Sequence, residues 1–154
     1  QASSLWVSTI DLPAHPPLYV GEWIESAAGS VVALSIEDRA NGKRFLYAPG
    51  VEAITPELDA AADAADAIFF DGTFWSLNEM VDHGLSERNA LDMGHLPITG
   101  DGGSHEWLKA KSAAHKVFFH INNTNPILNA SSAERRVVES AGIRVGADGY
   151  AIEL

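Results

Sequence analysis

Short apolar runs alternate along the chain with stretches whose residues favour turns and helices. The β-branched run 30–36 predicts a strand, and Asn41-Gly42 predicts a hairpin turn into a second strand at 44–48. Residues 66–70 and 116–121 are compact apolar runs between helical stretches, a pattern that is typical of buried strands. These four runs predict the framework of a β-sheet.

Helix start signals lie between the predicted strands. Thr55-Pro56-Glu57 places a hydroxyl cap, a proline and an acidic residue where the first turn of a helix favours them. Ser131 and Glu134 have the spacing of a capping box, and Gly142 provides a helix end. We therefore expect helices over 55–65, part of 76–90, 106–114 and 131–142.

The predicted order β-β-α-β-α-α-β-α-β-β favours an α/β (α+β layered) fold in which helices cover a sheet. The last two strands of this order are short edge strands expected within 143–154. Residues 1–28 contain several prolines and mixed polar and aromatic residues, so they are expected to form an irregular entry segment. The chain 1–154 has the length of a single domain.

Composition and charge narrow the class of protein. With 46% hydrophobic and 20% charged residues, the chain is too apolar for intrinsic disorder, yet no apolar run reaches the ~18 residues of a membrane helix. A net charge of −11 opposes partners such as nucleic acid or an anionic membrane. The chain has no cysteine, which excludes disulfides and thiolate metal sites, and no recognisable export signal, so we expect a cytoplasmic protein.

Two predicted strands end in residues that suit a functional site. Asp71 follows the run 66–70, and Gly72 after it allows the backbone to turn sharply. His120 follows the apolar residues of the run 116–121. Asp71 has an alternative role in capping or closing a turn, and His120 has one as a core histidine with satisfied hydrogen bonds.

Two loops contribute further candidates. His95 lies in a loop constrained by a glycine before it and a proline after it, although a surface histidine would fit the same pattern. A run of polar residues stands directly before Pro126 and includes Asn122, Asn123 and Asn125. This run predicts either a polar lining near a site or a helix-capping loop. Asp71, His95 and His120 offer only oxygen and nitrogen donors, which suit zinc, manganese or non-haem iron(II).

Three motifs, Phe69–Trp75, Met93–Ile98 and Phe119–Leu128, occur in an order and spacing that resemble the PqqB family of pyrroloquinoline quinone (PQQ) biosynthesis. Residues 44–50 and 148–154 fit the same pattern. The resemblance implies a metallo-β-lactamase-like αββα sandwich. It further implies that this chain supplies the C-terminal αβ half of that sandwich.

The resemblance also implies roles for the candidate residues. Asp71 and His120 would be metal ligands, with a divalent metal as cofactor, iron(II) favoured and zinc possible. His95 would lie near the metal or face the substrate. It would act in catalysis by positioning groups or moving protons, together with Asn122, Asn123 and Asn125. The reaction implied is hydroxylation of the tyrosine ring of a Glu–Tyr-derived precursor.

The same resemblance leaves other functions open. The family has been proposed to carry PQQ or its precursor to the periplasm, and most proteins of this fold are metal-dependent hydrolases. The metal-binding motif of the family's N-terminal half has no counterpart in this chain, which begins with Gln1 instead of Met. We therefore expect a fragment that is inactive alone, with the missing N-terminal half and a small-molecule or dipeptide precursor of PQQ as its partners. A homodimer is also compatible with the sequence.

Overall fold

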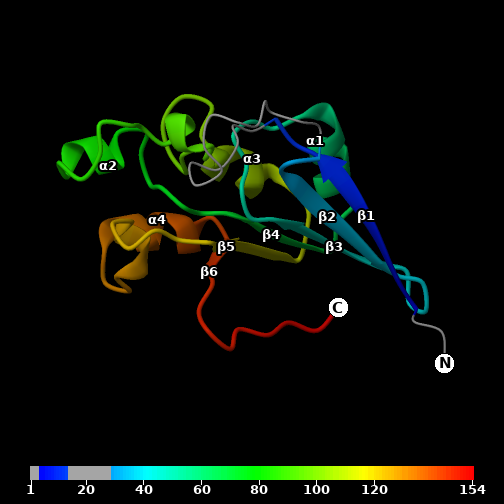
Figure 1. The fold of residues 1–154 in the computed structure, drawn as a ribbon. Helices are drawn as coiled ribbons and strands as arrows, with labels where there is room; N and C mark the ends of the chain where they lie inside the picture. The colour runs from blue at the N-terminus through cyan, green and yellow to red at the C-terminus, as the bar shows by residue number, and fades with distance from the viewer. Residues whose placement is uncertain (1–3, 14–28) are drawn as a thin grey trace.

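The fold is built on one six-stranded sheet in a computed structural model that describes residues 4–13 and 29–154. Across the sheet, the strands follow their order in the chain, β1-β2-β3-β4-β5-β6 (Figure 1). Their bounds are β1 Leu5–Asp11, β2 Val32–Asp38, β3 Lys43–Ala48, β4 Ala67–Asp71, β5 His115–Phe119 and β6 Arg144–Val145.

The sheet is antiparallel at one edge and parallel at the other. β1, β2 and β3 are paired antiparallel, and the hairpin between β2 and β3 turns at Asn41-Gly42 as predicted, with Gly42 at φ 76°. β3, β4, β5 and β6 are paired parallel, and their connections contain helices. The carboxyl ends of β4 and β5, which carry Asp71 and His120, therefore lie side by side at one edge of the sheet.

Within residues 4–13 and 29–154, four α-helices and two short 3-10 helices connect the strands. The Thr55 hydroxyl accepts from Leu58 N and caps the first helix as predicted, and the Ser132 hydroxyl caps the last by accepting from Arg135 N. The bounds are α1 Pro56–Asp63, α2 Glu79–Asp82, η2 Leu91–Met93, α3 Ser104–Ala110, η3 Pro126–Leu128 and α4 Ala133–Ser140.

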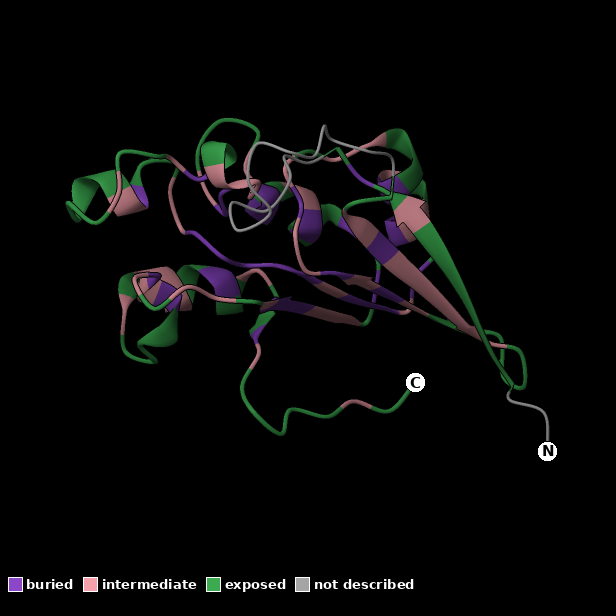
Figure 2. Cartoon of the chain, viewed as in Figure 1, coloured by how far each residue is buried: buried purple, intermediate pink, exposed green. Residues whose placement is uncertain are grey.

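The main core lies between the sheet and the helices. Alternate strand residues, including Leu46, Ile68 and Phe118, are fully buried there, and Leu58 of α1 and Leu108 of α3 pack into the same cluster. α1 and α3 lie over one face of the sheet, and purple buried segments concentrate along this boundary (Figure 2). The predicted layered α/β architecture is therefore confirmed.

The opposite face of the sheet is apolar but only half buried. The strand residues that alternate with the core residues lie on this face, and they include Phe45, Tyr47, Phe69 and Phe119. Their rings contact one another, with centroids 5.0 Å apart for Phe45–Phe69 and 4.8 Å apart for Tyr47–Phe119. The segment after β6 runs along this side in Figure 1, and its Tyr150 ring lies 6.0 Å from that of Phe69. We call this surface the open face.

The prediction that 1–28 is irregular is wrong for residues 5–11, which form β1. β1 pairs with β2 along its whole length, but as an edge strand exposed on most of its residues it has no alternating apolar pattern to reveal it. Residues 1–3 and 14–28 of that predicted segment lie outside the described residues.

Other element boundaries also differ from the prediction, and the last helix is capped by Ser132, one residue after the expected Ser131. The helix expected over 106–114 is α3, which begins at Ser104 and ends at Ala110, because Lys111 has extended backbone angles. Of the two edge strands expected within 143–154, only the two-residue β6 forms, and residues 146–154 have no regular structure. Within the described part of the chain, no helix has the length and apolar character needed to cross a membrane.

A candidate metal site at the ends of two strands

Asp71 is the last residue of β4, and its carboxylate is fully buried. Its Oδ2 accepts a hydrogen bond from Val51 N at 2.9 Å. Its Oδ1 accepts from Thr73 N at 3.1 Å and from the Thr73 hydroxyl at 2.6 Å. These donors come from the loops after β3 and β4, and they orient the carboxylate at the edge of the sheet.

Gly72 is required here for space. Its φ does not lie in the left-handed region, so the sharp turn that the sequence suggested is not its reason. A Cβ at this position would lie 2.9 Å from Phe118 Cβ and 3.1 Å from Phe119 O. Gly72 thus lets the chain leave β4 in close contact with β5, where Gly72 N donates to Phe119 O at 2.8 Å.

His95 reaches the same carboxylate from a distant loop. Its Nδ1 lies 2.6 Å from Asp71 Oδ2 and 3.1 Å from the Thr73 hydroxyl oxygen. Gly94 ends η2 in the left-handed conformation, and Leu96 N donates to Val51 O at 2.5 Å, which attaches the His95 loop to the loop after β3. The side chain of His95 is 18% exposed, so the ring is largely buried against the site.

His120 follows β5 and has φ 55°, the only positive φ among the described non-glycine residues. Its Nδ1 lies 3.2 Å from the Thr73 hydroxyl oxygen and 3.7 Å from Asp71 Oδ1, and its ring centroid is 5.4 Å from that of His95. The Thr73 hydroxyl is also placed to donate to His120 O at 2.9 Å. Because the side chain of His120 is 51% exposed, it forms the solvent-facing side of the site.

The electrostatics of the site favour an ionised aspartate. Burial by itself would raise the pKa of the Asp71 carboxyl, but His120, His95 and Thr73 together lower this pKa below its ordinary value. The Asp71 carboxylate in turn raises the pKa of His120, against the opposing effect of partial burial. A buried carboxylate that stays charged beside two imidazoles is a suitable environment for a cation.

Asp71, His95 and His120 each offer a ligand atom, and these atoms all lie within 4.8 Å of one another. Two imidazoles and one carboxylate are donors that zinc and non-haem iron(II) both accept, and three protein ligands leave positions open for water or a substrate. The residues present therefore fit a divalent metal ion. His95, which the sequence placed near the metal or facing the substrate, has the position of a third ligand.

The asparagines after β5 lie close to this site but are engaged with the backbone and with other side chains. Asn125 is buried, donates from Nδ2 to Gly72 O at 2.9 Å, and accepts from Ile127 N to cap η3. Asn122 donates from Nδ2 to the Thr124 hydroxyl at 2.6 Å, and Asn123 is exposed. Their catalytic roles stay predictions, and for Asn125 the capping alternative is the geometry observed.

Two residues of the site were not singled out from the sequence. Thr73 contacts Asp71, His95 and His120 through one hydroxyl, and its place two residues after a strand-end aspartate is the signal that would have identified it. Glu79 is buried at 4% exposure and contacts both strand-end loops. No sequence signal separates Glu79 from the other acidic residues of this stretch.

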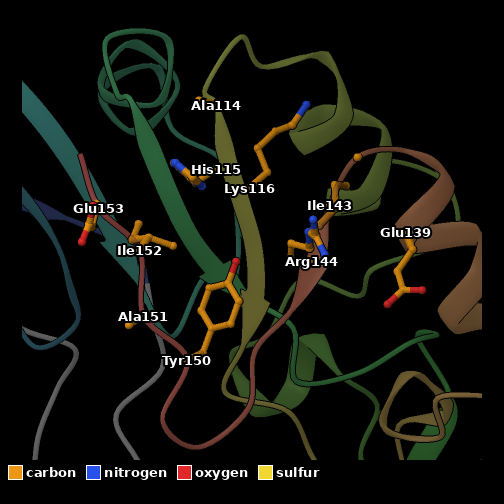
Figure 3. A pocket seen from close by; sticks show the side chains of 11 residues that line it. Ala114, His115, Lys116, Glu139, Ile143, Arg144, Tyr150, Ala151, Ile152 and Glu153 are labelled. Atoms are coloured by element: carbon orange, nitrogen blue, oxygen red, sulfur yellow. The ribbon is translucent and has the colours of Figure 1, made fainter.

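A separate hollow opens at the other ends of the parallel strands (Figure 3). It lies between the starts of β5 and β6 and the C-terminal segment, and its lining includes His115, Arg144 and Tyr150. The site residues Asp71, His95 and His120 are at the carboxyl ends of the strands and do not line it. The chemistry-bearing cluster and this hollow are thus distinct parts of the molecule.

Comparison with known families agrees with the metallo-β-lactamase-like fold expected from the sequence. Residues 9–121 match the family described as "Beta-lactamase superfamily domain". The chain is also similar to the crystal structure of Zn(2+)-bound PqqB from Methylobacterium extorquens, with a TM-score of 0.89 and 35% sequence identity over 98% of this chain and 51% of that one.

Curated relatives carry the same name. The chain is 42% identical over 153 residues to coenzyme PQQ synthesis protein B of Methylobacillus flagellatus, covering 99% of this chain and 50% of the relative. It is 41% identical to the protein of that name from Methylococcus capsulatus, covering 96% of this chain and 48% of the relative. The chain therefore spans about half the length of the curated relatives that it matches.

Proposed function

Since this chain belongs to the beta-lactamase superfamily and its relatives are PqqB proteins, we propose that it is part of a protein of PQQ biosynthesis. The observation that carries the proposal is the convergence of Asp71, His95 and His120 at one sheet edge in a chain of this ancestry. We place the activity in the cytoplasm and assign it to the whole protein, of which this chain is one portion.

The three residues would hold a divalent metal ion, iron(II) in the favoured form of the proposal. Such an ion supplies Lewis acidity, and iron(II) in addition provides reactivity towards dioxygen. The proposed reaction is hydroxylation of the tyrosine ring of a Glu–Tyr-derived precursor, in which dioxygen supplies the added oxygen atom and an external two-electron donor allows the other oxygen atom to leave as water. A metal-dependent hydrolase is the second candidate, and it is favoured by the zinc in the related PqqB crystal structure.

The chain's own residues would prepare the site in distinct ways. Asp71 is oriented by hydrogen bonds from Val51 N and Thr73, and His120, His95 and Thr73 keep its pKa below the ordinary value. His95 is held on the buried side, and His120 on the solvent-facing side, so a substrate would approach past His120. The Thr73 hydroxyl lies between both rings and the carboxylate, where it restrains the rotation of all three side chains.

The open face would take the rest of the protein. Its half-buried aromatic residues form a continuous apolar surface that none of the described helices covers, and they include Phe45, Tyr47, Phe69 and Phe119. The PqqB relatives are about twice as long as this chain. We therefore assign the open face to the portion of the protein that is present in the relatives and unmatched here.

The test reconstitutes the protein from this chain and the unmatched portion of a PqqB relative. Iron(II) or zinc is added, a Glu–Tyr dipeptide is supplied in air with ascorbate as the two-electron donor, and products are analysed by mass spectrometry. We expect a product with the mass of one added oxygen atom, dependent on iron(II) and lost in His120→Ala. The matched control is His83→Ala, an exposed histidine outside the cluster, which should retain the product.

Three results would contradict the hydroxylation proposal. Oxygen incorporation that is equal in His120→Ala and in the unsubstituted protein would exclude the proposed site. Turnover of an ester with zinc, and no hydroxylation with iron(II), would favour the hydrolase. Binding of a quinone that survives Asp71→Asn, without turnover of either kind, would favour carriage.

A further inference from the structure

Two loops carry ligands of the candidate metal site, and hydrogen bonds join them at several points. The loop after β4 follows Asp71, and the loop after β5 begins with His120. Asn122 N donates to Thr73 O at 3.1 Å, and Asn125 Nδ2 donates to Gly72 O at 2.9 Å. The relative placement of the two ligands thus depends on how firmly these loops are joined.

Glu79 is a side chain that contacts both of these loops. It begins α2, is 4% exposed, and forms no ion pair among the described residues. Its Oε2 accepts from Trp75 N at 2.6 Å within the loop after β4. Its Oε1 accepts from the hydroxyl of Thr124, which belongs to the loop after β5.

The Thr124 hydroxyl continues the contact towards His120. It accepts from Asn122 Nδ2 at 2.6 Å, and Asn122 is two residues from His120. A buried carboxylate without a cation is costly unless its oxygens accept hydrogen bonds, and Glu79 obtains one such bond for each oxygen from a different loop. The buried Glu79 carboxylate therefore holds the loop after β4 and the loop after β5 together.

We propose that Glu79, acting through Thr124 and Asn122, is a positioning residue that sets His120 against Asp71 for metal binding. This inference deepens the proposed function and rests on it for the presence of the metal. Glu79 contacts none of the three candidate ligands directly, so its effect would pass through the loop after β5. Groups that orient metal ligands commonly change metal affinity by 10–100-fold when they are removed.

The experiment measures Co(II) affinity and the visible spectrum of the Co(II) complex in the full chain. Thr124→Val removes the hydroxyl at nearly constant volume, and Thr124→Ser restores it. We expect Thr124→Val and Glu79→Ala each to weaken Co(II) binding by about tenfold and to alter the spectrum. Thr124→Ser should recover both, and Glu79→Ala/Thr124→Val should be little worse than either single variant because one contact is removed twice.

A second measurement does not depend on metal. In the metal-free chain, hydrogen exchange at the amides of Trp75 and Asn122 should be faster in Glu79→Ala and Thr124→Val than in the unsubstituted chain and Thr124→Ser. Thermal melting separates lost stability from lost positioning, because a variant that only weakens the fold would lower Tm and keep its Co(II) spectrum.

The outcomes distinguish this inference from the proposed site. No Co(II) binding by the unsubstituted chain, or binding that is unchanged in His120→Ala, would refute the metal site, and the exchange data would then decide the loop contact alone. Binding that is lost in His120→Ala but remains within twofold of normal in Glu79→Ala and Thr124→Val would overturn the positioning role of Glu79.

Discussion

His120 combines a candidate ligand ring with a backbone conformation that few non-glycine residues adopt. Alternation along β5 would place it on the face opposite to Phe119, but φ 55° ends the strand and directs the ring to Thr73 and Asp71. A non-glycine residue with positive φ destabilises the fold, and such residues occur often at functional sites. His120 is thus a residue at which stability is given up for geometry.

Replacing His120 should separate the backbone strain from the ring. We expect His120→Gly to be more stable than His120→Ala by about 1 kcal/mol, because glycine adopts positive φ without a steric penalty. Both variants lose the ring, so the difference reports on the backbone alone. The measurement is urea unfolding of the metal-free chain.

His83 is a control for this comparison, since it is exposed and has φ −83°. There the order should reverse, with His83→Ala more stable than His83→Gly, because glycine carries only its entropic cost at an ordinary φ. If the alanine variant were the more stable one at both positions, the backbone of His120 would not be strained.

Gly72 illustrates a glycine that is needed for close contact. Gly72→Ala should destabilise the chain by about 1–3 kcal/mol, since its Cβ would overlap Phe118 Cβ and Phe119 O and push β4 and β5 apart where the site lies. Gly50→Ala is the control, because its Cβ would meet only Val31 Cγ1 at 3.8 Å. Comparable losses at Gly72 and Gly50 would contradict this explanation.

Among the elements, α1 and α3 are joined by hydrogen bonds from a lysine and a tryptophan to aspartates of α1. Lys111, directly after α3, donates to Asp59 at 2.5 Å and to Asp63 at 2.7 Å, both on α1, and Trp107 Nε1 of α3 donates to Asp59 at 2.7 Å. The hydrogen bond from Lys111, with that from Trp107, lowers the pKa of Asp59. Burial alone would lower the pKa of Lys111, but its aspartate partners raise it above the ordinary value.

These shifts predict a pH dependence of stability. Because the pKa of Asp59 is lower in the folded chain, the interaction stabilises the fold above the unfolded pKa of about 3.9. That contribution is lost as pH falls through the lower folded pKa. When the pH is lowered from neutral to about 3, the free energy of unfolding should therefore fall less in Lys111→Met than in the unsubstituted chain. Urea unfolding at each pH measures this difference.

Lys116→Met serves as the control for the lysine prediction. Its ammonium donates to the carbonyl oxygens of Lys109 and Lys111, at 3.0 Å in each case, and these groups do not titrate. The variant should lose stability by a similar amount at every pH in this range. If Lys111→Met also shifted the whole curve evenly, the aspartate pairing would not account for its stabilisation.

At the scale of the whole molecule, the sheet has one face covered by helices and one apolar face that is only half buried. A sheet with both faces apolar is stable in water when both are covered. The C-terminal segment contacts the open face through Tyr150, and the aromatic residues of this face remain partly exposed. This arrangement is the basis of the proposed association with the portion found in the longer relatives.

The association can be measured directly with that portion as a separate polypeptide. Tyr47→Glu introduces a charge on the open face and should weaken the complex by at least about tenfold, because an unpaired charge would be buried in the interface. Val137→Glu, at an exposed position of α4, should leave the affinity unchanged. Equal affinity in both variants, with Tm values showing that both fold, would exclude the open face as the interface.

Sequence alone determined the parts of this protein that depend on neighbouring residues. The β2–β3 hairpin, the buried strands before Asp71 and His120, the Thr55 cap and the family resemblance are all contained in short stretches of chain. β1 escaped prediction because an exposed edge strand is defined by its pairing with β2, and its own residues carry little periodicity.

Only the tertiary structure decided how the site is assembled. His95 lies 24 positions from Asp71 in the chain, and its contact at 2.6 Å depends on how the loop around Gly94 packs against the loop after β3. The proposed roles of Thr73 and Glu79 likewise rest on contacts between the β4 and β5 loops. A single sequence reports residue types and local periodicity, whereas distances between side chains on separate loops are set by the packing of the whole sheet edge.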